Sequence, residues 1–83
     1  MKECEDLNST EIAVLIICCD VCDNSPNCHV SREKITKKIQ LKKPIKILKT
    51  LISSGFIVKH PTRGSMTYAI TKRGIDCVNK NRI

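Results

Sequence analysis

The chain has no long hydrophobic run, and this absence bears first on where the protein can act. The longest apolar stretch, Ile12 to Cys19, is eight residues, whereas a helix that crosses a bilayer needs about 20. The N-terminus, MKECEDLN, is also acidic overall, whereas a secretion signal carries positive charge there. We therefore expect a cytoplasmic protein with no membrane partner.

The chain also lacks the residue groupings that enzymes use. It has no glycine-rich phosphate-binding loop, and residues 31–83 hold no pair of carboxylates that could divide the acid and base roles. His60 precedes a turn. His29 directly follows Cys28, and in an extended chain the side chains of Cys28 and His29 would point in opposite directions. We therefore expect no catalytic residues and no enzymatic activity.

What remains is a small basic chain. Its 83 residues suffice for one domain, 1–83, and a domain of this size buries only roughly 60–65% of its unfolded surface. Residues 1–30 hold one base and six acids, whereas residues 31–83 hold fourteen bases and two acids, giving a net charge of +7. So basic a segment favours a polyanionic partner, although a solvated lysine-rich surface would explain the charge equally well.

Capping residues and hydrophobic periodicity predict four helices. Asn8 and Glu11 have the spacing of a capping box before the first apolar run, and Ser31 is an N-cap residue for the second helix. Pro44 suits a first helical turn, and Gly55 suits the left-handed residue that ends a helix. The predicted helices span about 8–22, 31–40, 43–54 and 71–81.

The segment between the third and fourth helices predicts a β-hairpin over 56–70. Period-2 alternation places Phe56 and Val58 on one face of its first strand, and PTRG is a turn sequence. A minor strand near Cys28–Val30 could join the hairpin. Helices combined with this small sheet predict an α+β fold.

The second and third helices carry the strongest functional signal. From Arg32 to Lys49 the chain has eight bases and one acid. Two short helices joined by a tight turn can place the second helix in the major groove of DNA, where lysines reach phosphates. The third helix has no Arg, Asn or Gln to read guanine or adenine, which indicates modest sequence specificity or recognition of DNA shape. The residues predicted to bind DNA are Arg32, Lys42, Lys43, Lys46, Lys49, Thr50 and, at the hairpin tip, Arg63.

The order of these elements resembles the winged-helix DNA-binding domains of small transcriptional regulators from bacteria, archaea and archaeal viruses. The similarity rests on the phrases LNSTE, LISSGFIVKH, PTRGS and YAITKRG and covers nearly the whole chain. It implies a winged helix-turn-helix with a three-helix core, a two-stranded β-wing and a C-terminal helix. It also implies a recognition helix at Lys43–Ser53, a wing at Pro61–Ser65 and a homodimer formed by the first and last helices. The cysteines and the lysine-only recognition helix depart from the family.

The first helix is apolar on more than one face. Its apolar positions Ile12, Leu15, Ile16 and Cys19 form one stripe. Further apolar residues cover much of the remaining surface: Ala13, Val14, Ile17, Cys18 and Val21. Because the core of so short a chain covers only one side of a helix, we expect the second side to meet another copy of the protein.

The six cysteines allow several arrangements. We expect no cofactor, but Cys19, Cys22, Cys28 and His29 could together supply the four ligands of a zinc site. A local Cys22–Cys28 disulfide is also possible, as is a Cys4–Cys77 disulfide within or between subunits. Cys18 and Cys19 could instead serve as small core residues.

The sequence therefore predicts a homodimeric transcriptional regulator that binds double-stranded DNA, with the third helix in the major groove and the wing at the minor groove. Two different functions stay open. One is a winged-helix module that binds proteins, and the second is a redox- or metal-responsive DNA-binding sensor that uses the cysteine cluster.

Overall fold

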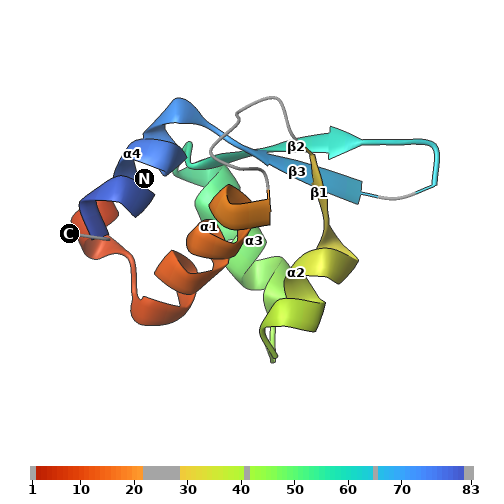
Figure 1. Cartoon of the computed structure of the whole chain (residues 1–83), viewed down its shortest axis with the longest axis horizontal. Helices are drawn as coiled ribbons and strands as arrows, with labels where there is room; N and C mark the ends of the chain where they lie inside the picture. Colours follow the sequence, from red (N-terminus) through yellow and green to blue (C-terminus); the bar gives the residue numbers. More distant parts are fainter. Residues whose placement is uncertain (1, 22–28, 41, 65, 82–83) are drawn as a thin grey trace.

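Within the described residues, four α-helices accompany a three-stranded antiparallel sheet, so the fold is α+β as predicted (Figure 1). The computed structural model describes residues 2–21, 29–40, 42–64 and 66–81. The helices are the short 3-10 helix η1 (Cys4–Asp6), α1 (Ser9–Val21), α2 (Arg32–Lys38), α3 (Pro44–Ser53) and α4 (Lys72–Asn81). The strands are β1 (Val30–Ser31), β2 (Ile57–Pro61) and β3 (Met66–Ile70).

The predicted start of α1 and end of α3 are confirmed by their hydrogen bonds. The Asn8 side chain accepts from the Glu11 backbone N–H at 2.8 Å, and the Glu11 carboxylate accepts from the Asn8 N–H at 2.9 Å, which is a capping box. Gly55 has a φ of 81°, and the next N–H, that of Phe56, donates to the Leu51 carbonyl oxygen at 3.0 Å. The left-handed glycine thus closes α3 and turns the chain into β2.

Side-chain caps are also present at α2 and α4. The Ser31 hydroxyl accepts a backbone N–H from the first turn of α2 at 3.3 Å, and the Thr71 hydroxyl accepts the Gly74 N–H at 3.1 Å. Helix α2 ends at Lys38, earlier than the predicted position near residue 40, because Ile39 is extended.

The strands lie in the order β1-β3-β2, so the last strand in sequence is the middle one. The minor strand expected near residues 28–30 is β1, which pairs with β3 through Val30 and Tyr68. The predicted shared face of Phe56 and Val58 is wrong, because Phe56 precedes β2 and is buried whereas Val58 is 42% exposed. The strand starts one residue later, with Ile57 facing the core.

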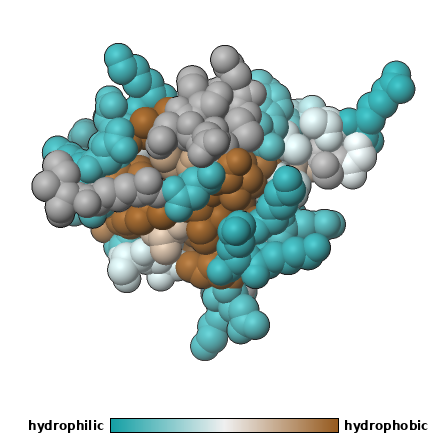
Figure 2. Space-filling model, in the orientation of Figure 1, coloured by the Kyte–Doolittle hydropathy of each residue, from teal (hydrophilic) through white to brown (hydrophobic). Residues whose placement is uncertain are grey.

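Helix α1 packs against α2, α4 and β3 and forms the centre of the core. Val14, Leu15, Cys18 and Cys19 on α1 are buried, so the prediction that the last two are core residues is confirmed. The remaining apolar side chains of α1 that pack against the core keep part of their surface exposed, namely Ile12, Ile16, Ile17 and Val21. Figure 2 shows hydrophobic surface over this part of the molecule.

The N-terminal segment is tied to α4 by a disulfide between Cys4 and Cys77, with the two Cα atoms 5.7 Å apart. Of the two forms that the sequence allowed for this pair, the structure contains the one within a single chain. Arg73 adds hydrogen bonds to the carbonyl oxygens of Ser54 at 3.0 Å and Lys2 at 3.1 Å. The disulfide and Arg73 therefore join η1, α4 and the end of α3.

Candidate nucleic-acid interface

Helix α3 has one face in the core and one basic face in solvent. Leu48 and Leu51 are buried, and Ile47 and Ile52 pack beside them. Ile45 points outward and is 49% exposed. A shallow surface groove runs over this outer face, lined by Lys42, Lys43, Pro44, Ile45, Lys46, Lys49, Thr50 and Ser53.

The Thr50 hydroxyl is less available as a hydrogen-bond donor to a ligand than the sequence suggests. Its hydroxyl donates to the carbonyl oxygen of Lys46 at 3.1 Å, one turn earlier in α3. Because the hydroxyl proton is used within the helix, Thr50 is left as an acceptor. The charged hydrogen-bond donors of the groove are therefore its lysines.

Arg32 at the start of α2 is anchored to the sheet. Its Nε and Nη2 atoms donate to the Tyr68 hydroxyl at 3.3 and 3.2 Å, and Tyr68 is a buried residue of β3. Arg32 thus fixes α2 against the hairpin while staying partly exposed. The lysines of α2 are all exposed: Lys34, Lys37 and Lys38.

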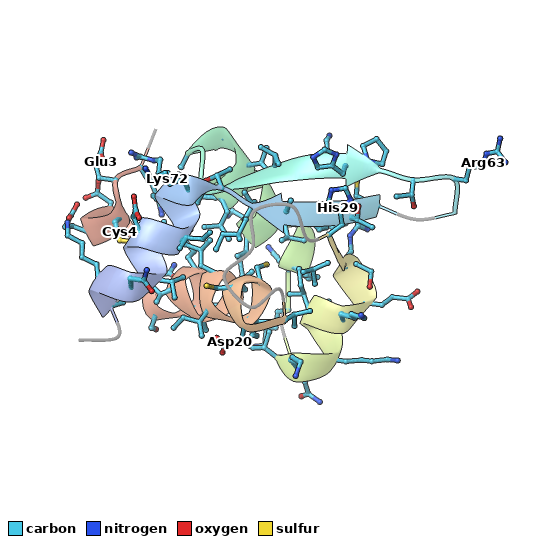
Figure 3. The ribbon with its side chains drawn as sticks, turned by 45° about the horizontal axis from the view of Figure 1, so that its top comes forward. Glu3, Cys4, Asp20, His29, Arg63 and Lys72 are labelled. Carbon is cyan, nitrogen blue, oxygen red and sulfur yellow. A yellow bond between two sulfur atoms is a disulfide. The ribbon has the colours of Figure 1, made fainter. Side chains whose placement is uncertain are left out.

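The β2–β3 hairpin projects from the body and carries Arg63 at its tip, pointing away from the rest of the fold (Figure 3). Beside the sheet, the rings of His29 and His60 are stacked with centroids 4.3 Å apart and planes inclined by 19°. The stack links the residue before β1 to β2 across the middle strand. Nothing in the sequence indicated that these two histidines are in contact, because they become neighbours only through the order of the strands.

The charges of the described residues are segregated. All three salt bridges among them lie around η1, where Lys2 pairs with Glu11 at 3.1 Å, Arg73 with Glu3 at 3.1 Å and Lys80 with Glu5 at 2.7 Å. The hydrogen bond from Lys80 lowers the pKa of the Glu5 carboxyl. Within the part of the chain that is described, no lysine of α2 or α3 forms a salt bridge.

The termini and α4 lie at one end of the molecule, and α2 and the hairpin tip lie at the opposite end (Figure 1). Figure 3 shows the same separation, with Glu3, Cys4 and Lys72 at the end opposite Arg63. The described salt bridges therefore lie at the end of the molecule opposite α2 and the hairpin tip.

The predicted zinc site and the Cys22–Cys28 disulfide depend on Cys22 and Cys28, which lie outside the described residues. Among the residues that are described, no three His, Cys, Asp or Glu side chains cluster as metal ligands would. Burial raises the pKa of the Cys18 thiol to about 12, so Cys18 stays protonated at neutral pH.

In the same described ranges, no helix is long and apolar enough to cross a membrane.

No protein-family model and no curated protein matches the chain. One similar solved structure is described as a reported archaeal mechanosensitive channel that is a structural homolog of MarR-like transcriptional regulators. It aligns with a TM-score of 0.77 and 20% identity over 95% of this chain and 61% of its own, so the present chain spans less than two thirds of that protein. A second, the Type III plasmid segregation protein TubR, aligns with a TM-score of 0.63 and 18% identity over 96% of this chain and 79% of its own.

The fold is a winged helix. In this fold α2 and α3 form the helix-turn-helix, and the β2–β3 hairpin is the wing. The predicted DNA-binding residues lie on these elements or in the turns between them. Arg32 begins α2, Lys42 and Lys43 precede α3, Lys46, Lys49 and Thr50 belong to α3, and Arg63 is at the wing tip. The sequence did not reveal the Arg32–Tyr68 contact, the histidine stack or the anchoring role of Arg73, because each joins segments distant in the chain.

Proposed function

We propose that this protein binds double-stranded DNA as a transcriptional regulator, with α3 in the major groove and the wing at the minor groove. The observation that carries the proposal is the basic outer face of α3. Its groove is lined by four lysines, none of which has a salt-bridge partner among the described residues: Lys42, Lys43, Lys46 and Lys49. Lysines so placed can replace the counterions of DNA phosphates. Arg63, projecting from the wing tip, suits the narrow minor groove beside the helix.

The proposal includes a homodimer that uses α1 and α4. Its support is the apolar surface that the monomer leaves partly exposed on those helices, at Ile12, Ile16 and Ile75. A two-fold axis there would present two copies of α3 to half-sites roughly 34–36 Å apart on one side of the duplex. Native mass spectrometry measures the state directly: a dimer is expected, and a monomer at all micromolar concentrations would contradict this part of the proposal.

DNA binding is tested by titrating a fluorescent duplex over a salt series. The plot of log K against log salt should be steep for the wild type. Its slope should become shallower by about 1.8 for Lys46→Ala and for Arg63→Ala, since each substitution removes one cationic contact to DNA from each of the two subunits. Lys72→Ala is the matched control, because Lys72 is exposed on α4 at the opposite end of the molecule. Its slope should equal that of the wild type.

Two results would oppose the proposal. One is the absence of salt-dependent binding at micromolar protein. The second is an equal loss of affinity in Lys72→Ala and Lys46→Ala, which would indicate attraction by net charge with no defined face.

A further inference from the structure

Ile45 is a large apolar side chain that lies outside the hydrophobic core. It is 49% exposed and, with Val58, one of two large hydrophobic residues of the described chain that are classed as exposed. The inner face of α3 is already filled by Leu48 and Leu51, both buried. Ile45 is the second residue of α3, directly after Pro44, and the first turn of a recognition helix is the part that meets base edges.

The surroundings of Ile45 restrict what can cover it. Four lysines, Lys42, Lys43, Lys46 and Lys49, line the same groove. An apolar protein surface seated on Ile45 would have to desolvate those charges without compensation, whereas a duplex presents phosphates to them. Charge complementarity therefore favours the major groove of DNA as the surface that covers Ile45.

In the major groove, the apolar feature that distinguishes one base pair from another is the C5-methyl group of thymine. The polar side chains of this face are poorly suited to base selection. The lysines are flexible point charges, and Thr50 donates its hydroxyl proton to the Lys46 carbonyl oxygen within the helix.

We propose that Ile45 is the specificity-determining residue of α3 and that it selects thymine by packing on its C5-methyl group. This inference rests on the proposed function and makes it more specific. The protein should prefer A·T base pairs at the step that Ile45 faces, for a reason independent of minor-groove shape.

The test removes and adds the methyl group in the DNA. The probes are an alternating A–T duplex, the same duplex with deoxyuridine in place of thymidine, an alternating G–C duplex, and the same duplex with 5-methylcytosine. Wild-type protein should bind the thymidine duplex about 4-fold more tightly than the deoxyuridine duplex for each methyl contacted, which corresponds to about 0.8 kcal/mol per buried carbon. The 5-methylcytosine duplex should gain over unmethylated G–C in the same sense, because its methyl lies at the equivalent position of the groove.

Variants assign the preference to the side chain. Ile45→Ala should bring the thymidine-to-deoxyuridine ratio to about 1, whereas Lys46→Ala should weaken binding to both duplexes and keep the ratio. Val58→Ala is the matched control, since it removes an exposed aliphatic side chain (42%) from β2 and should leave the ratio intact.

Equal binding of thymidine and deoxyuridine duplexes by the wild type would overturn the inference while leaving the proposed function in place. So would an unchanged ratio in Ile45→Ala, or a ratio lost in Val58→Ala. Failure to bind any of the four duplexes would instead overturn the proposed function, and this inference with it.

Discussion

Reduction of the Cys4–Cys77 disulfide removes the covalent link between η1 and α4. The two residues are 73 positions apart, so the bond closes a loop that contains most of the chain. In the chain-entropy treatment, cross-linking a loop of this length removes unfolded-state entropy worth about 4.4 kcal/mol at 25 °C. Because small domains are stable by roughly 5–15 kcal/mol, this bond should account for a large share of the free energy of unfolding.

The noncovalent contacts around the bond are too weak to replace it. The Glu3–Arg73 and Glu5–Lys80 pairs are solvent-exposed, and exposed pairs contribute little to stability because water screens them. We therefore expect the reduced protein to stay folded at low temperature and to lose roughly 18–35 °C in Tm, from about 4–8 °C per kcal/mol for a domain of this size. Its urea m-value should rise, since the unfolded chain expands once the loop is open.

Urea unfolding followed by circular dichroism, with and without dithiothreitol, measures this effect in wild type and Cys4→Ser. Cys4 is the better position to change, because Cys77 is 3% exposed and its replacement would also disturb packing. Reductant should bring the wild type close to the variant and leave the variant unchanged. A wild-type shift below about 1 kcal/mol would refute the loop-closure argument, and an equal shift in Cys4→Ser would assign the effect to the remaining cysteines.

Three further predictions concern stability and reactivity. Gly74→Ala should lower the free energy of unfolding measured in urea by at least about 2 kcal/mol, although alanine is the better helix former, because the new Cβ would lie 2.3 Å from the Phe56 carbonyl oxygen. Glu11→Ala should lower it by about 1–3 kcal/mol, since the Asn8 N–H loses its acceptor at the start of α1; thermal melting measures this. Burial raises the pKa of Cys18 from 9.0 to about 12, so its thiol should resist alkylation at pH 8 until the protein unfolds, and its contribution to stability, complete below pH 9, should decline as pH rises toward 12.

The sequence predicted most reliably those features whose cause is local. The Asn8–Glu11 capping box and the left-handed Gly55 each depend on a few consecutive residues, and the structure has both where they were expected. Gly74 shows the limit of such reasoning. Its sequence context indicates only a weakened helix, whereas its role is to let α4 approach the Phe56 carbonyl oxygen and Ile70, a contact that exists only after the hairpin has formed.

The candidate site was predictable to the same extent. The density of lysines from Arg32 to Lys49 is a property of composition, so the sequence could name α2 and α3 as the basic elements. It could not show that Arg32 is held by Tyr68, because that bond depends on β1 pairing with β3. The Thr50 bond to the Lys46 carbonyl oxygen was within reach, since threonine often bonds the carbonyl four residues earlier in a helix.

The segregation of charge links the two ends of the molecule. Each of the three described salt bridges uses an acid from residues 3–11, and its basic partner comes from the N-terminus or α4. The two exposed pairs, Glu3–Arg73 and Glu5–Lys80, add little to stability, so their position matters more for the surface that they leave free. An acid paired with a lysine of α3 would cancel one counterion released on binding, and with it about 0.9 of the slope of log K against log salt. Because the acids of the three salt bridges lie at residues 3–11, they leave the lysines of α3 available to phosphate. Arg73, which pairs with Glu3, also holds the C-terminal end of α3 by its hydrogen bond to the Ser54 carbonyl oxygen.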